Sequence, residues 1–355
     1  MKKKYNYLKL AFLALFLCSL NSFGTETSCL ASYKTPYLKW KNLPIPIYAS
    51  ASLPPRFKVL LNEEIQKWNS SFKMKLFDYR GSSTFCHKKE INCVVLEKHS
   101  KYLALSGVED YALTKQDFKH DYWVGADIFL NSGFKWKHPA SVGEVDPGKV
   151  ILHELGHVLG LQHHFFHLNS IMNYLPYEAG DVDLEISIFD KEILEWLYLG
   201  GKCPEDYLLA FIDGQEDLSM ELLKKKYTDF SKITDVNLLY LISRLERSKN
   251  ELDNSLKTID MAIELSSHKS NIIKAYLLNH KADLYFRKND IKSATKNFEE
   301  SLKLWPGNYL TLTYLAQIKI LMGESNKEAL ALLKQALKIK PTFKLAKELS
   351  LQIKK

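Results

Sequence analysis

The segment HELGHVLGLQHH, residues 153–164, constrains the fold of this chain more than any other stretch. It carries four of the 11 histidines found in 355 residues. Residues four apart lie on one face of a helix, so His153 and His157 project side by side at a separation that one metal ion can bridge. Neutral imidazoles are good zinc ligands, and a catalytic zinc site has three protein ligands and one open position. We therefore expect a helix that carries two ligands and a third ligand that follows it.

The third ligand has to come from beyond a break in that helix. In a continuous helix, His164 would lie roughly 16 Å further along the axis, at about 1.5 Å per residue. Gly160 can end the helix, because glycine accepts the positive φ found at helix C-termini. The chain can then turn back and bring His163 against the other two rings. We predict one Zn²⁺ ion held by His153, His157 and His163.

Glu154 follows the first ligand and is the candidate catalytic base. One residue along a helix rotates the side chain by about 100°, so its carboxylate can sit beside the open coordination position rather than on the metal. Zinc lowers the pKa of a bound water to about 7, and a neighbouring carboxylate can take the proton and pass it to a leaving amine. These residue types in this order predict metal-assisted hydrolysis of peptide bonds.

A second signal follows in SIMNY, residues 170–174, where Met172 stands nine residues beyond His163. The combination of HELGHVLGLQH and SIMNY resembles the metzincin clan of zinc metallopeptidases, in which a methionine turn lies under the metal. ADIFLN, residues 126–131, and SIFDKEILEWLYLGG, residues 187–201, are similar to the edge strand and the closing helix of the matrixins. The resemblance covers roughly residues 35 to 201.

The resemblance implies a role for each matching residue. His153, His157 and His163 are the ligands, Glu154 is the general base and Met172 is the structural methionine. In addition, the strand that contains Ala126, Ile128 and Leu130 would pair with an extended peptide or protein substrate as an added strand.

One position departs from the matrixin pattern. Matrixins usually have proline two residues after the methionine, whereas this chain has Tyr174, as astacins and serralysins do. In those families the tyrosine approaches zinc and can stabilise an oxyanion, so Tyr174 is a second candidate catalytic residue. A tyrosine packed within the turn is the alternative. The sequence shows no aspartate-rich calcium loop, and calcium is not expected.

The first 24 residues have the pattern of a signal peptide. They combine a lysine-rich start, an apolar run from Leu10 to Leu20 and small residues near Gly24. The run is short for a permanent anchor, and no later segment is apolar enough to span a membrane. We expect an exported protein, either secreted or held in the periplasm or cell envelope. A lipid-modified Cys18 is the alternative, although Leu17 is bulkier than lipoprotein signals normally tolerate.

Removal of the first 24 residues would leave four cysteines in an oxidising compartment, where disulfides form. The short segment CHKKEINC favours a pairing of Cys86 with Cys93 across a hairpin, which leaves Cys29 with Cys203. Free buried thiols are the alternative.

Residues 30–203 are predicted to form an α+β domain with a twisted mixed sheet and the active-site helix. The expected strands are residues 43–50, 72–79, 92–99 and 126–131. An amphipathic helix is expected over residues 54–71, with Val59, Ile65 and Trp68 on its apolar face. His164 and His167 are expected at the rim of the site or in solvent.

Residues 204–235 are expected to be a helical linker, and residues 236–355 an all-α repeat domain. In residues 236–355, the spacing of small and large apolar residues resembles the tetratricopeptide repeat. One unit shows the pattern at Leu278, Ala282, Tyr285, Ala294, Phe298 and Pro306, and the next at Leu312, Ala316, Gly323, Ala329, Leu333, Ala336 and Pro341. An earlier, degenerate unit over about residues 236–267 shows it at Leu239, Ile242, Ile259 and Ala262. An irregular helical bundle is the alternative. Stacked repeats offer a concave surface, so a protein partner is expected there.

Two functions of different classes follow from these observations, and a hydrolase of non-protein amides is a third possibility that an edge strand fits less well than an extended peptide. The first is a secreted zinc endopeptidase whose repeats bind a substrate or partner. The alternative is a non-catalytic, zinc-containing scaffold protein of the cell envelope. Glu154 argues for the enzyme, because a structural zinc site usually closes its fourth position with another Cys or His. The sequence shows no nucleic-acid motif.

Overall fold

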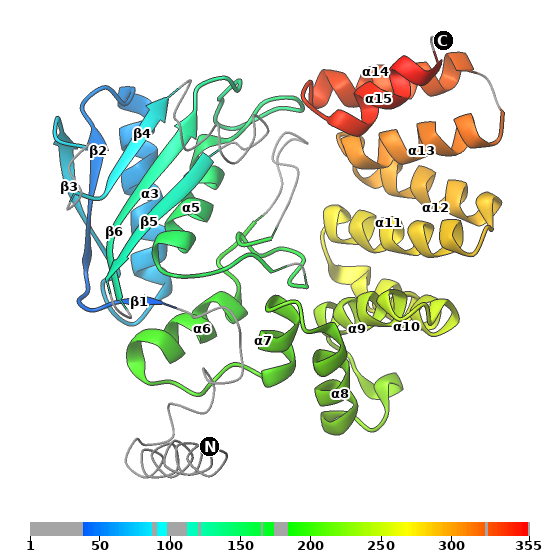
Figure 1. Ribbon diagram of the computed structural model, residues 1–355, viewed down its shortest axis with the longest axis horizontal. Coiled ribbons are helices and arrows are strands. Elements are labelled where there is room, and N and C mark those ends of the chain that lie inside the picture. Colours follow the sequence, from blue (N-terminus) through cyan, green and yellow to red (C-terminus); the bar gives the residue numbers. More distant parts are fainter. Residues whose placement is uncertain are drawn as a thin grey trace, which may run out of the picture.

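The computed structural model describes residues 38–86, 91–97, 112–119, 122–164, 166–173, 184–323 and 326–353. An α+β part comes first and an all-helical part follows it, as Figure 1 shows. The predicted fold class, an α+β domain followed by an all-α repeat domain, is confirmed. The predicted signal peptide, residues 1–24, lies outside the described residues.

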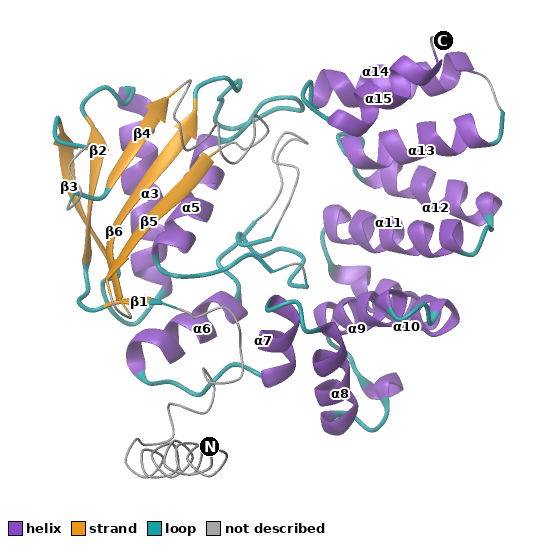
Figure 2. Ribbon diagram, viewed as in Figure 1, coloured by secondary structure: helices purple, strands orange, loops and turns teal. Residues whose placement is uncertain are grey.

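The α+β part is built on one mixed sheet (Figure 2). Its six strands are β1 (Lys39–Trp40), β2 (Ile45–Ser50), β3 (Phe77–Ser83), β4 (Cys93–Glu97), β5 (Ala112–Lys119) and β6 (Tyr122–Asn131). The order is β3, β2, β4, β6, β5, and β1 pairs with the first two residues of β6. All neighbours run parallel except β5, which is antiparallel to β6. Among the described strands, β5 pairs with β6 alone, so it forms one edge of the sheet.

The position of β6 corrects one prediction. Residues 126–131 were expected to be the edge strand that receives substrate, but β6 pairs with β4 on one side and with β5 on the other. Ala126, Ile128 and Leu130 are at most 5% exposed and belong to the core. Their backbone groups are engaged in the sheet, so this strand has no free edge for a substrate.

Helix α3 (Pro55–Ser71) packs against helix α5 (Pro147–Val158), which contains His153 and His157. Proline in the first turn suits a helix start, because its missing N–H would have no intrahelical partner there. Ile65 and Trp68 are fully buried as predicted, but Val59 is 58% exposed. The buried stripe of α3 runs through Leu61, Ile65 and Trp68, and Val59 lies off this stripe, which corrects the predicted face.

The bounds and number of the strands also differ from the prediction. The strand expected over residues 72–79 begins only at Phe77, the one expected over residues 126–131 begins at Tyr122, and β5 was not predicted. Asn69, near the end of α3, accepts hydrogen bonds from the backbone N–H groups of Leu76 and Phe77, both at 2.9 Å. These two bonds tie the start of β3 to the helix, and this contact is not encoded in strand periodicity.

Helix α6 (Ile188–Leu199) closes the α+β part. Ser187 and Asp190 form a reciprocal capping box at its start, and Gly200 ends it with a φ of 65°. The predicted disulfide between Cys86 and Cys93 is present. Cys203 is also disulfide-bonded. Its predicted partner, Cys29, lies outside the described residues.

The helical part consists mainly of paired helices. They are α7 (Asp206–Ile212), α8 (Glu216–Lys226), α9 (Val236–Ser248), α10 (Leu252–Leu265), α11 (Asn271–Arg287), α12 (Ile291–Leu304), α13 (Tyr309–Leu321), α14 (Asn326–Ile339) and α15 (Lys344–Ile353), with single 3₁₀ turns at η2 (Phe230–Lys232) and η3 (Ser266–His268). Pairing of α9 with α10, α11 with α12 and α13 with α14 follows the three predicted units. A residue with positive φ follows the first helix of each pair, namely Asn250, Asn289 and Gly323. Asparagine and glycine tolerate this conformation best, so the turn recurs with the repeat.

The two parts share contacts at both ends of the helical part. Phe166 stacks edge-on against Phe211 of α7 at 6.0 Å, and Asn237 of α9 accepts a hydrogen bond from the backbone of Leu168 at 3.0 Å. At the other end, the Lys340 ammonium lies 5.7 Å from the ring of Phe134, which follows β6. Across the described ranges, no helix has both the length and the apolar composition needed to cross a bilayer.

Candidate metal centre

Helix α5 carries the first two predicted ligands and begins at a strong cap. The Asp146 carboxylate accepts hydrogen bonds from the backbone N–H of Gly148 at 2.8 Å and of Lys149 at 3.4 Å. The His138 ring contacts the same carboxylate at 2.8 Å. Pro147 occupies the first helical position. Because free N–H groups at a helix start need acceptors, this cap fixes where α5 begins.

The helix ends where the sequence predicts. Gly160 has a φ of 96°, and its N–H donates to the carbonyl of His157 at 2.9 Å, while Leu161 N donates to Gly156 O at 3.0 Å. A Cβ atom at Gly160 would lie 2.5 Å from the carbonyl oxygen of Leu38. Both the backbone angle and this close approach require glycine. The chain then turns back toward α5.

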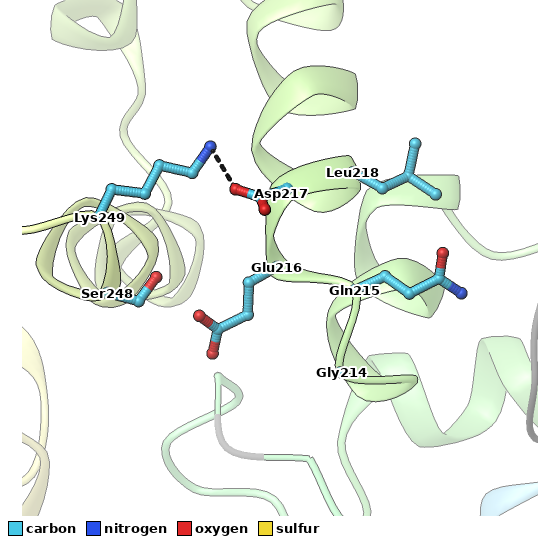
Figure 3. Close-up of a pocket in the computed structure, with 7 residues that line it drawn as sticks. All are labelled: Gly214, Gln215, Glu216, Asp217, Leu218, Ser248 and Lys249. Carbon is cyan, nitrogen blue, oxygen red and sulfur yellow. Dashed lines mark ion pairs between the residues drawn. The ribbon is translucent and has the colours of Figure 1, made fainter.

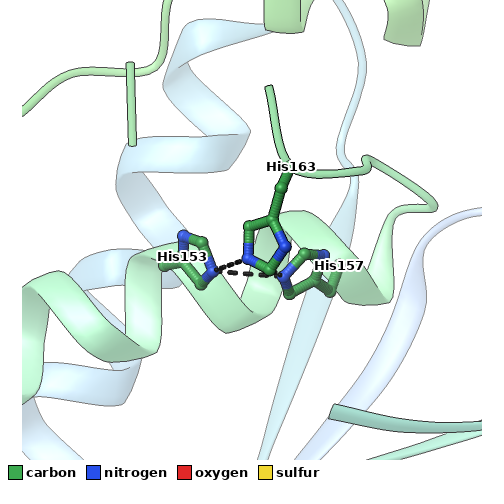
Figure 4. Close-up of side chains that lie close together, drawn as sticks. All are labelled: His153, His157 and His163. Carbon is green, nitrogen blue, oxygen red and sulfur yellow. Dashed lines mark hydrogen bonds between the residues drawn. The ribbon is translucent and has the colours of Figure 1, made fainter. Parts of the chain in front are cut away.

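The turn brings the three predicted ligands together (Figure 4). The Nε2 atoms are 3.0 Å apart for His153 and His163, 3.1 Å for His157 and His153, and 3.1 Å for His157 and His163. A tetrahedral zinc with ligands at about 2.05 Å would place them about 3.3 Å apart. Within the part of the chain that the structure describes, this is the one group of three such side chains close enough to share an ion.

The second nitrogen of two rings fixes their orientation. Nδ1 of His153 lies 2.6 Å from the carbonyl of Ile171, and Nδ1 of His157 lies 2.8 Å from the carbonyl of Leu161. A carbonyl can only accept, so each Nδ1 carries the proton and each Nε2 of these neutral rings presents a lone pair. Lone pairs that converge at about 3 Å repel one another unless a cation lies among them. The donor set and its geometry therefore fit zinc.

Burial keeps the three rings neutral. It lowers the pKa of His153 to about 3, with a further contribution from the nearby His157 ring, and the Ile171 carbonyl opposes the shift. Burial also lowers the pKa of His157, and it holds the pKa of His163 well below its usual range. Neutral imidazole is the form that binds metal, so the rings are ready for an ion at neutral pH.

Met172 lies beneath the ligand helix, and a glycine makes room for it. Met172 is fully buried. A Cβ atom at Gly156 would lie 2.4 Å from the Met172 sulfur and 3.2 Å from the Trp68 ring. The carbonyl of Met172 accepts a hydrogen bond from the backbone of His164 at 3.2 Å. Gly156 therefore serves the packing of the methionine turn, a role that spacing alone did not reveal.

Glu154 is 6% exposed and contacts the edge strand. The Thr114 hydroxyl of β5 donates to its Oε2 at 2.5 Å and lies 3.2 Å from its backbone carbonyl. One turn further along α5, the Gln116 amide donates to the carbonyl of His157. Sequence reasoning missed both residues. The available signal was ALTKQDFK, a strand-like run separated by two residues from YWVGADIFLN, as in a hairpin.

His164 was expected at the rim or in solvent, and this was wrong. It is 1% exposed, and its Nε2 lies 2.8 Å from Asp190 of α6. The other carboxylate oxygen of Asp190 accepts from the hydroxyls of Ser170 and Ser187, both at 2.8 Å. Burial opposes ionisation of Asp190, but the His164 ring and the two hydroxyls outweigh it and lower the pKa of this carboxyl. This buried group holds the methionine turn against α6.

One predicted site residue falls outside this description. Tyr174 lies outside the described residues, and its proposed approach to zinc stays a prediction. His167 is half-buried rather than fully in solvent.

The helical part has a hollow of its own on the side formed by α9, α11 and α13, with a cavity of about 440 Å³. Its lining is aromatic and charged, and includes Tyr240, Tyr276, Phe286, Phe298, Tyr314, Arg247, Asp283 and Arg287. Asp283 accepts from Arg247 at 2.8 Å and from Arg287 at 2.9 Å. Rings beside oriented charges suit the side chains and backbone of a bound polypeptide.

A separate hollow of about 470 Å³ lies between the turn that joins α7 to α8 and the end of α9 (Figure 3). The Lys249 ammonium lies 3.0 Å from the Asp217 carboxylate, which is 96% exposed. An exposed ion pair of this kind is worth little energetically. We do not assign a function to this hollow.

Comparison with known proteins places similarity in the N-terminal region. The chain is 36% identical over 98 residues to matrix metalloproteinase-21 of Cynops pyrrhogaster, covering 27% of this chain and 15% of the relative. Identity to the Xenopus laevis protein is 32% over 117 residues, covering 32% and 18%, and to the human protein 35% over 98 residues, covering 27% and 16%. The match thus spans less than a fifth of these relatives. No family model matches the chain.

Solved structures resemble the chain at low sequence identity. They include the APC/C hetero-tetramer Cut9–Hcn1, at 18% identity and a TM-score of 0.38 over 42% of this chain and 28% of that one. YrrB, described as a TPR protein with an unusual peptide-binding site, gives 14% identity and a TM-score of 0.35 over 45% and 78%.

Proposed function

We propose that this protein is an exported, zinc-dependent endopeptidase of the metzincin type. The observation that carries the proposal is the convergence of three neutral Nε2 atoms within 3.0 to 3.1 Å, with Glu154 next along the same helix. Similarity to matrix metalloproteinase-21 supports the same class. The ligands are His153, His157 and His163.

Each residue has a part in hydrolysis. His153, His157 and His163 would hold a zinc ion, which would supply Lewis-acid chemistry to a scissile carbonyl and to an attacking water. Glu154 accepts the proton of that water and delivers it to the leaving amine. Carbonyl groups of Ile171 and Leu161 keep two of the rings in the tautomer that binds metal. Tyr174 remains a candidate for stabilising the oxyanion.

We propose that the substrate is an extended peptide that adds to β5. This strand has one partner among the described strands, whereas the strand first expected to do so is interior. A substrate that pairs with β5 as an added strand forms backbone hydrogen bonds to it and is held in an extended conformation beside α5. The side of β5 not paired with β6 is the edge available for this purpose.

The helical part is proposed to bind a protein, either the substrate or a partner. The aromatic and charged hollow on α9, α11 and α13 supports this role. Export is proposed from the first 24 residues, because their basic start, short apolar run and small residues match a signal peptide.

Replacement of Glu154 tests the proposal. We expect Glu154→Gln to lower kcat for cleavage of an unfolded protein by at least about 10²-fold, the usual worth of a general base. Its zinc content, measured by mass spectrometry, should equal that of the parent. Glu63→Gln, an exposed position on α3, is the matched control and should cleave normally.

Two outcomes would contradict the proposal. A parent protein with one zinc per chain and no cleavage of any unfolded protein would favour the zinc-containing scaffold. Cleavage by Glu154→Gln at the parent rate would remove Glu154 from the mechanism.

A further inference from the structure

The geometry points to Thr114 as a positioning residue that holds the carboxylate of Glu154 in place. This inference rests on the proposed function, because it takes Glu154 as the general base. Thr114 belongs to β5, outside the zinc-binding segment and 40 residues before Glu154 in the sequence.

Strand geometry directs Thr114 at the active-site helix. Side chains alternate between the two faces of a strand, so Thr114 and Gln116 share one face. Both reach α5: the Thr114 hydroxyl contacts Glu154, and the Gln116 amide donates to the carbonyl of His157. The edge strand is thus attached to the helix at two successive turns.

The hydroxyl of Thr114 restrains Glu154 from two directions. Its single proton is donated to Oε2 at 2.5 Å, and the hydroxyl oxygen also lies 3.2 Å from the backbone carbonyl oxygen of Glu154, where the same proton can be shared. A glutamate has three side-chain torsions, and a hydrogen bond to one carboxylate oxygen selects one rotamer among them. The χ1 angle of threonine is itself restricted, because its Cβ is branched.

This contact joins two functions in one strand. If the backbone of β5 binds the substrate, as proposed, then the same strand sets the position of the base relative to the scissile bond. Reaction rates depend steeply on such alignment, since small displacements of reacting groups cost large factors. Thr114 acts through Glu154 and does not itself exchange a proton with substrate.

Kinetics of two Thr114 variants test the role. Thr114→Val keeps the shape but loses the donor, and we expect kcat to fall by about tenfold or more while KM and zinc content change less than about twofold. Thr114→Ser restores the donor, and kcat should return to within about threefold of the parent. Thr295→Val, on α12, is the matched control, because its hydroxyl donates within its own helix.

Crystal structures of the metal-free parent and of Thr114→Val provide a readout independent of activity. We expect one Glu154 conformer in the parent, hydrogen-bonded to Thr114, and a different or divided conformer in the variant. The inference is overturned if the parent lacks the hydrogen bond, if Thr114→Val keeps its kcat, or if Thr114→Ser is as impaired as Thr114→Val. A parent that does not cleave peptides would overturn the proposed function, and with it any effect of Thr114 on catalysis. The structures alone decide whether Thr114 positions Glu154.

Discussion

At the scale of single residues, the metal centre depends on groups that are not ligands. Backbone carbonyls orient the rings of His153 and His157, and a side-chain hydroxyl holds Glu154. Gly156 lets the Met172 sulfur approach the helix. The two carbonyls determine whether these rings are ready for a metal, because an imidazole that is turned or protonated cannot bind it.

Gly156→Ala should destabilise the protein. Alanine stabilises a helix interior by about 1 kcal/mol relative to glycine. Against this, its Cβ would lie 2.4 Å from the Met172 sulfur, and overpacking of a core costs about 1 to 3 kcal/mol. We expect the cost of the clash to exceed the gain in helix propensity, so that the free energy of unfolding, measured in urea, falls by about 1 kcal/mol.

A double-mutant cycle separates the two effects. Met172→Ala removes the clashing sulfur, so Gly156→Ala should lower the free energy of unfolding less in a Met172→Ala protein than in the parent. If it costs as much there as in the parent, the clash with Met172 is not the cause.

At the scale of elements, the edge strand and the helix pairs carry the functional surfaces. β5 runs along α5 and attaches to it through Thr114 and Gln116. In the helical part, the first helices of the three pairs line one hollow. The pair of α9 and α10 also buries a carboxyl group, that of Glu246, which is 6% exposed.

Stability should depend on pH through Glu246. Burial raises the pKa of this carboxyl to about 7, although the Thr258 hydroxyl opposes the shift. Between its unfolded pKa, about 4.3, and the raised value, the folded state binds a proton that the unfolded state does not. Stability must therefore fall as pH rises through this window and then level off above it.

Glu246→Gln tests this dependence, because glutamine has no proton to lose. The parent should lose stability relative to the variant between pH 5 and pH 8, by about 1.4 kcal/mol for each unit of pKa difference. Glu264→Gln, an exposed position on α10, is the control and should follow the parent. Urea unfolding at several pH values gives the free energy of unfolding as a function of pH. The prediction is refuted if this free energy changes equally with pH in the parent and in Glu246→Gln.

At the scale of the whole molecule, the α+β part shares a hydrophobic core with helices α7 to α11 of the helical part. Leu155 of α5 and Met172 belong to the same buried cluster as Leu209 of α7 and Leu239 of α9. The far end of the helical part also contacts the loop after β6, through Lys340 and Phe134. Because this core crosses the boundary between the two parts, we expect them to unfold as one cooperative unit.

Zinc should therefore stabilise both parts together. We expect one calorimetric transition that moves to higher temperature with zinc, by the equivalent of about 2.7 kcal/mol at a free concentration of 100 times Kd. His153→Ala combined with His157→Ala should show no such shift. Two separate transitions, only one of which responds to zinc, would show that the parts unfold independently.

The site was predictable where its geometry is local. Spacing of four residues places His153 and His157 on one face, and Gly160 ends the helix before His163 in the sequence and in the structure. The helices of the repeats follow from apolar periodicity for the same reason, since neighbours along a helix are neighbours in sequence. These features needed no knowledge of distant contacts.

Other features depended on residues that are far apart in the chain. The sheet order made β5 rather than β6 the edge, and it placed Thr114 beside Glu154. Packing of α6 buried His164 against Asp190. Strand-like composition is the same for an edge strand and an interior strand, and a histidine has the same local pattern in solvent or in a core. Only the tertiary structure decides these cases, because pairing partners and burial are set by contacts that local periodicity does not encode.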